Sequence, residues 1–179
     1  MNINLSEDKK MILKIMEEKK EYFTFNKEYK GFRISIMEGY SDMNLYYIEK
    51  ETDIKKDDYL NYLSNTQVRE ELSNGMMKCS LLEKQNPNFW YEKISYGEDV
   101  SIEKIIKTDN YMISYSETPN KYLDIQTNRE NYLTIIRTKE DTLTKIEGLI
   151  CLDEFETVQE VVVEGLIDYL NKLEVAIKK

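Results

Sequence analysis

The chain has 179 residues, a formal net charge of -9 and an isoelectric point of about 4.8. A negatively charged surface repels phosphate groups, so we expect neither a nucleic acid nor a membrane surface as a partner. The length suits one domain, spanning residues 1–179, that buries enough apolar surface to fold without metals or disulfides.

Several kinds of functional site lack the residues that they need. The chain contains no histidine, two cysteines and six glycines. Without histidine there is no catalytic triad and no imidazole zinc site, and the glycines are not spaced as in phosphate-binding loops. We therefore expect no catalytic, cofactor-binding or metal-binding residue and no cofactor. Cys79 and Cys151 lie in apolar stretches and are expected to be free, buried thiols.

The sequence also bears on location. No stretch approaches the roughly 18 apolar residues that cross a membrane, and the N-terminal residues have no apolar secretion core. We therefore expect a soluble, cytoplasmic protein. A secreted protein without its signal peptide would have the same composition, so that alternative stays open.

The chain begins with a helical pattern that gives way to strands. Ser6 is placed to cap an N-terminal helix that carries apolar residues up to Met16. Apolar side chains at every second position predict a strand around residues 32–37. Residues 43–49 predict the strand that returns beside it.

Helical spacing resumes at residues 57–72, with a break expected near Asn65 and an end at Gly75, which tolerates a positive φ. From there the pattern is mostly that of strands joined by short turns. Residues 100–106 fit either a short helix or a strand. The segments that we expect to be strands are 76–83, 89–96, 111–116, 122–126, 132–137 and 143–152.

The last helix has the clearest pattern. Thr157 and Glu160 have the spacing of a capping box, in which each side chain satisfies a free backbone amide. Gly165 interrupts the helix, where we expect a closely packed neighbour. The apolar residues that we expect to pack on the sheet, in a contact essential for folding, are Val158, Val161, Val162, Leu166, Tyr169, Leu170, Leu173 and Ile177.

Strands joined by short turns favour antiparallel pairing. The predicted fold class is α+β: a mainly antiparallel sheet of about six to nine strands, with N-terminal, middle and C-terminal helices packed on it. An α/β/α sandwich is one arrangement that fits this order.

Aromatic residues and one acidic pair are the candidates for contact with a partner. The chain holds 14 tyrosines and a single tryptophan. Tryptophan and tyrosine are enriched among the residues that dominate interfaces, although core packing is the more frequent role of such rings. The candidate partner-binding residues are Trp90, Tyr91, Tyr46, Tyr47, Glu98 and Asp99.

The preferred function is that of a non-enzymatic protein-binding domain, of the immunity or chaperone type, that neutralises a basic protein partner. Two alternatives stay open. One is a carboxylate-dependent hydrolase that acts without histidine, and the other is a structural subunit of a phage or cell-envelope assembly. The sequence leaves the oligomeric state open.

Overall fold

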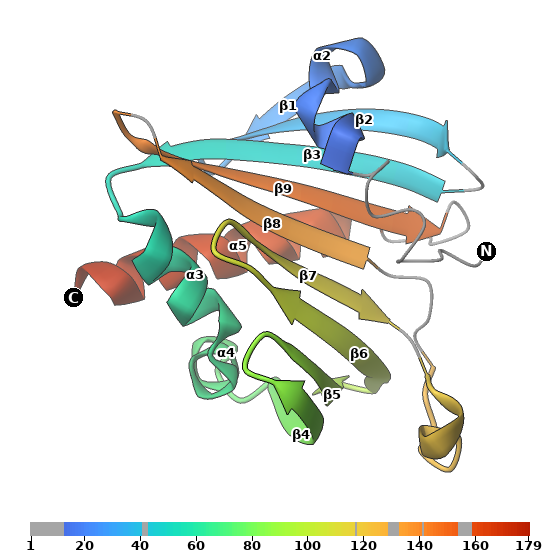
Figure 1. Ribbon diagram of the computed structural model, residues 1–179. Helices are drawn as coiled ribbons and strands as arrows, with labels where there is room; N and C mark the ends of the chain where they lie inside the picture. The colour runs from blue at the N-terminus through green and yellow to red at the C-terminus, as the bar shows by residue number, and fades with distance from the viewer. Residues whose placement is uncertain (1–12, 41–42, 117, 129–132, 141, 154–158) are drawn as a thin grey trace.

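The computed structural model describes residues 13–40, 43–116, 118–128, 133–140, 142–153 and 159–179 (Figure 1). Within these residues nine strands form one antiparallel sheet in the order β1-β2-β3-β9-β8-β7-β6-β5-β4. The strands are β1 (Thr24–Tyr29), β2 (Phe32–Tyr40), β3 (Met43–Thr52), β4 (Met77–Asn86), β5 (Phe89–Tyr96), β6 (Asp99–Lys107), β7 (Tyr111–Ser116), β8 (Leu133–Glu140) and β9 (Thr144–Asp153).

The helices connect and cover this sheet. They are α2 (Lys19–Tyr22), α3 (Lys56–Ser64), α4 (Thr66–Leu72), the 3-10 helix η1 (Asn120–Tyr122) and α5 (Gln159–Lys178). Residues 13–17 are also helical. Figure 1 shows the chain leaving β3, passing through α3 and α4 to the far edge at β4, and returning strand by strand to β9 beside β3.

Each face of the sheet has its own core because successive side chains of a strand point to opposite faces. The inner face packs on α3 and α5, whose buried residues include Tyr59 and Ile167. The outer face packs on Ile15 and Met16, from helical residues 13–17. The predicted α+β class, with an antiparallel sheet and helices at the start, middle and end of the chain, is confirmed. The predicted cap at Ser6 lies outside the described residues.

The predicted break between the middle helices is confirmed at Asn65. This residue is extended, with φ -80° and ψ 114°, and its side chain accepts a hydrogen bond from the backbone N–H of Val68 at 3.1 Å. Asn65 therefore ends α3 and caps α4. Gly75 has a φ of +79°, as expected of a glycine that lies beyond the end of a helix.

The apolar stripe predicted for the last helix is rotated relative to the one observed. The residues of α5 that are fully buried are Val163, Ile167, Leu170 and Leu173. Val161 is 67% exposed, so its assignment to the stripe is wrong. The capping box at Thr157, and Val158 of the stripe, lie outside the described residues.

Two further local predictions are wrong. Residues 122–126 form the end of η1 and a turn, not a strand. No atom would lie within 4 Å of a Cβ at Gly165, so this glycine has no closely packed neighbour. The close approach is instead at Gly148, where a Cβ would lie 2.7 Å from Cγ1 of Ile48.

Both cysteines are free, as predicted. Cys151 is buried on the outer face, and burial raises its pKa to about 12. Cys79 is only half-buried because it lies on the edge strand β4, so the prediction of full burial is wrong for this residue. None of the helices in the described part of the chain combines the length and apolar character that a bilayer crossing requires.

Candidate functional site

The inner face of the sheet has an apolar half and a polar half. Over β1, β2, β3 and β9 the buried side chains are mostly apolar, as at Ile34 and Ile48. Over β5 to β8 several inner positions hold polar side chains that are also buried. We name this set the inner polar row, and its members are Glu92, Ser101, Glu103, Ser114, Ser116, Thr134 and Thr138.

The strand register explains why these groups form a row. Glu92 is paired with Glu103, and Glu103 is paired with Ser116. Directly paired residues of an antiparallel sheet point to the same face. The hydroxyl of Ser114 donates to Glu103 at 2.5 Å, which adds a side-chain contact along the row.

Arg69 of α4 closes over the row and binds Glu92. Its Nη2 atom lies 2.6 Å from each carboxylate oxygen. Trp90 Nε1 and the hydroxyl of Thr66 also donate to this carboxylate, at 2.9 and 2.7 Å. Glu92 is fully buried and Arg69 is 6% exposed. Burial lowers the pKa of Arg69, but the Glu92 carboxylate raises it by more, so the guanidinium stays charged.

Some buried polar atoms on this side of the sheet have no hydrogen-bond partner. Within the described residues the buried side-chain atoms that lack one are Tyr59 OH, Arg69 Nε, Thr134 Oγ1, Thr138 Oγ1 and Tyr169 OH. Thr134 and Thr138 are paired with Ile150 and Ile146, which belong to the inner core. The other three come from the helices above this face. All five unpaired atoms therefore lie between the inner face and α3, α4 and α5.

Ion pairs fasten α5 to the strands along one of its sides. Lys30 contacts Asp168 at 2.8 Å, and Lys50 contacts Glu174 at 2.8 Å. On α5, apolar residues that are only half-buried and packed against the inner core include Val162 and Leu166. The helix is therefore held to β1–β3 by charge and packed on the inner core by apolar contact.

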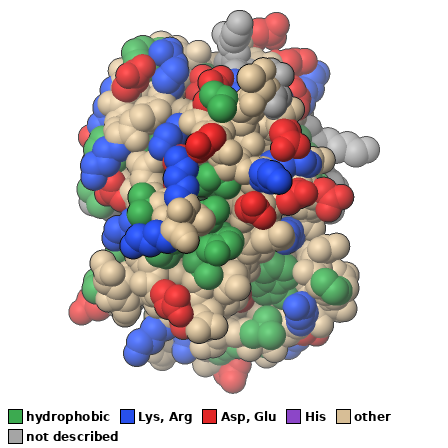
Figure 2. Space-filling view, turned by 90° about the vertical axis from the view of Figure 1, so that its left-hand side faces the viewer, with side chains coloured by type: hydrophobic (Ala, Val, Ile, Leu, Met, Phe, Trp, Pro, Cys, Tyr) green, Lys and Arg blue, Asp and Glu red, His purple; other side chains and the backbone are tan. Residues whose placement is uncertain are grey.

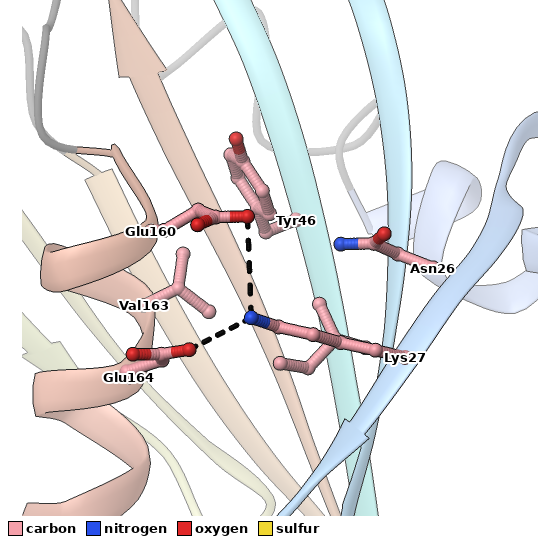
Figure 3. Close-up of a pocket in the computed structure, with 7 residues that line it drawn as sticks. Asn26, Lys27, Tyr46, Glu160, Val163 and Glu164 are labelled. Atoms are coloured by element: carbon pink, nitrogen blue, oxygen red, sulfur yellow. Dashed lines mark hydrogen bonds and ion pairs between the residues drawn. The ribbon is translucent and has the colours of Figure 1, made fainter.

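A small pocket lies between β1 and the start of α5. Figure 3 shows Lys27 reaching from β1 toward Glu160 and Glu164, at 3.9 and 2.7 Å, with Asn26 and Tyr46 facing the same space. The space in the pocket that no atom fills amounts to about 180 Å³, open solvent included. Sites for drug-sized ligands usually measure about 300–1,000 Å³. Even with the open solvent counted, this pocket is too small for a drug-sized ligand.

The structure also bears on metal binding and on the distribution of surface charge. No three Cys, Asp or Glu side chains of the described residues lie together in a way that could hold a metal ion. On the face drawn in Figure 2, acidic and basic side chains are interspersed and hydrophobic side chains gather between them. That face therefore carries no uniform acidic patch for a basic partner.

The structure separates the aromatic residues that the sequence nominated. Trp90 and Tyr46 lie on the inner face, and the hydroxyl of Tyr46 donates to Gln159 at 2.6 Å. Tyr47 belongs to the outer core, where its hydroxyl donates to Glu147. Tyr91 also points outward, with its ring centroid 6.1 Å from that of Tyr122.

The strands β9, β8, β7 and β6 separate the two tyrosines of β3 from Trp90 and Tyr91 of β5. These four rings are at most 9% exposed. Glu98 and Asp99 are exposed at the turn between β5 and β6. Of the nominated set these two acids are the ones that a partner could reach, and their role in binding stays a prediction.

Sequence reasoning missed most of the polar site. Glu92 falls between Trp90 and Ile94 on the same face of β5, and all three are buried. A charged residue at a strand position whose neighbours two residues away are apolar is the signal that could have identified Glu92. Arg69 and Tyr169 carry no comparable signal, because charged and tyrosine side chains occur on most helix surfaces.

The comparisons with known proteins bear on the fold. No model of a known protein family and no curated protein matches the sequence. Among solved structures, human STARD10 superposes with a TM-score of 0.67 at 10% identity, over 91% of this chain and 77% of its own. The STAR-related lipid transfer protein of Xanthomonas axonopodis reaches 0.63 at 10% identity, over 88% and 99%. Human StAR-related lipid transfer protein 5 reaches 0.59 at 9% identity, over 97% and 95%.

This likeness is one of fold, since the identities are low. A long C-terminal helix held against an antiparallel sheet is the helix-grip arrangement of START and Bet v 1-like proteins. The predicted immunity-type or chaperone-type protein binder is therefore wrong: two of these structures are named for lipid transfer, and the rings that suggested an interface are core residues. The same finding replaces the hydrolase and the structural subunit that we kept as alternatives.

Proposed function

We propose that the protein binds a small amphipathic molecule, with a lipid-like apolar part, between α5 and the inner face of the sheet. The fold supports this proposal, since two of the similar structures are named as lipid transfer proteins. The observation that carries it is the set of five unpaired polar atoms, which all lie on this side of the sheet. A bound molecule that carries oxygen atoms would supply their partners.

The energetic argument is that unpaired buried polar atoms are costly. Each one costs about 1–3 kcal/mol relative to a hydrogen-bonded state, so native proteins keep few of them. Apolar residues packed around the site, among them Met112, Ile105 and Leu166, would receive the hydrocarbon part of the ligand. Side chains occupy this space in the structure, so binding requires the helices above the polar half of the sheet to move away from it.

The single tryptophan provides a direct test. Trp90 donates to Glu92 within the proposed site, so its fluorescence should respond to a ligand there. We expect saturable fluorescence changes with dodecanol, dodecanoic acid or monododecanoylglycerol, and a complex of one ligand per chain in native mass spectrometry.

Two tyrosine variants separate specific binding from a general effect on the fold. Tyr169→Phe removes an unpaired hydroxyl of the site and should weaken binding. Tyr115→Phe changes a buried tyrosine of the outer core and should not. If no amphiphile alters Trp90 fluorescence and none is retained in mass spectrometry, the proposed function is wrong.

A further inference from the structure

We infer that this site selects amphiphiles whose head group is uncharged and carries an oxygen acceptor, such as an alcohol, ketone or ester, over carboxylates and phosphates. The inference rests on the proposed function and adds the chemical class of the ligand. Its basis is the position of three side chains that each carry one buried atom without a hydrogen-bond partner, and the charge of the groups around them.

The three side chains that carry these unpaired atoms come from three helices. Tyr59 belongs to α3, Arg69 to α4 and Tyr169 to α5, and each presents an N–H or O–H group without a partner. Burial raises the pKa of Tyr169, and the nearby charge of Arg69 opposes that rise. Burial also raises the pKa of Tyr59, with smaller contributions from Glu174 and Tyr169. The helix α4, which carries Arg69, contacts both α3 and α5, so the three donors lie on neighbouring helices above the same face of the sheet.

The charge of Arg69 is already matched. Its guanidinium contacts both oxygens of Glu92 at 2.6 Å, while the unpaired Nε remains available as a donor. Glu103 lies directly opposite Glu92 on the neighbouring strand and is also buried. The sheet therefore places a second buried carboxylate next to the one that already neutralises Arg69.

A charged ligand would upset this balance. A carboxylate or phosphate would add a further buried negative charge beside Glu92 and Glu103, and unpaired buried charges are far more costly than hydrogen-bonded neutral groups. An alcohol or carbonyl oxygen accepts hydrogen bonds from Arg69 Nε and the tyrosine hydroxyls without adding charge. Glu92 is thus the residue that sets the charge preference, because it neutralises the guanidinium that would otherwise bind an anion.

The test compares ligands of equal chain length. Binding of dodecanol, dodecanoic acid and dodecyl phosphate is measured by calorimetry at pH 8, where both acids are ionised. We expect dodecanol to bind the native protein at least about tenfold more tightly than either anion, a difference typical of one unfavourable charge contact. Glu92→Gln keeps the shape of the side chain and frees the charge of Arg69, so dodecanoate should bind this variant about tenfold more tightly than it binds the native protein.

The control is Glu147→Gln, which removes a buried carboxylate that is paired with Arg137 on the outer side of the sheet. It should leave the ratio of the affinities unchanged. If Glu92→Gln does not fold, Glu103→Gln removes the opposite carboxylate and should shift the ratio in the same direction. Folding of each variant is checked by circular dichroism.

The outcomes separate the two proposals. Dodecanoate binding as tightly as dodecanol to the native protein would overturn the inference and leave the proposed function standing. No gain of dodecanoate affinity in the folded Glu92 or Glu103 variant would also overturn it. Failure of every ligand to bind the native protein would overturn the proposed function itself, and the inference with it.

Discussion

Replacing the ion pair between Arg69 and Glu92 by apolar residues tests whether this pair is kept for ligand binding or for stability. Arg69→Met leaves a fully buried carboxylate without its cation. Glu92→Met leaves a buried guanidinium without its carboxylate, and it removes the acceptor of the Trp90 and Thr66 donors. Breaking a buried pair in this way typically costs about 3–5 kcal/mol, so each single variant should lose that much unfolding free energy.

The double variant should behave differently because no buried charge remains. Apolar replacement of both partners of a buried pair is often neutral or stabilising. Trp90 Nε1 still loses its acceptor, at a cost of about 1–3 kcal/mol, so we expect the double variant within about 2 kcal/mol of the native protein. Additive losses would instead reach about 6–10 kcal/mol, which approaches the total stability of many domains.

Urea unfolding followed by circular dichroism measures the four proteins of this cycle under identical conditions. A midpoint of the double variant close to that of the native protein, combined with loss of ligand binding, would assign the pair a functional role. A double variant that loses as much free energy as the two single variants together would refute the reasoning, because the pair would then not be coupled.

Three further predictions use other parts of the fold. Ile167→Ala should cost about 2–5 kcal/mol of unfolding free energy by leaving a cavity under α5, whereas Val161→Ala, at an exposed position of the same helix, should change it by less than about 0.5 kcal/mol in the same urea assay. Gly148→Ala should cost about 1–3 kcal/mol because its Cβ would lie 2.7 Å from Ile48, and combining it with Ile48→Ala should cost less than the sum of the single losses. Burial alone would raise the pKa of Glu174, but hydrogen bonds from Lys50 and Thr52 lower it below 4.5. The ionised carboxylate therefore stabilises the folded protein above about pH 4.5, and this stability is lost as the pH falls through the pKa of the folded state. Thermal melts should therefore show a smaller decline on acidification below about pH 4.5 for Glu174→Gln than for the native protein.

Local patterns predicted the strands best where turn residues bound them on both sides. The predicted strands 89–96 and 111–116 coincide with β5 and β7. The strand predicted at 122–126 rested on alternation over only five residues, and it is wrong: Leu123 in this segment is exposed. The loop is held instead by contacts such as those of the Asn128 side chain with the backbone of Glu98 and Val100. A short alternating pattern does not distinguish a strand from a loop that packs one ring against the sheet.

The rotation of α5 could not be predicted from its own sequence. Its apolar residues span a wide arc, so periodicity alone allows neighbouring rotations. In the observed rotation, three acids of α5 contact lysines that are more than one hundred positions away in the sequence. The pairs are Glu164 with Lys27, Asp168 with Lys30, and Glu174 with Lys50. The site has the same origin, since Arg69 meets Glu92 only after α4 folds across β5.

The pairing of β3 with β9 has a consequence for how the chain folds. The end of β3, at Thr52, is paired with the start of β9, at Thr144. When these two strands pair, they therefore close a loop that contains all the chain between them. Closing such a loop lowers the entropy of the chain before any ladder contact compensates for it, and folding rates fall as contacts become more distant in sequence. Until β9 is in place, β3 and β8 each have an unpaired edge that can join another chain. We therefore expect slow refolding whose yield falls as protein concentration rises, with the pair of β3 and β9 as the last to form.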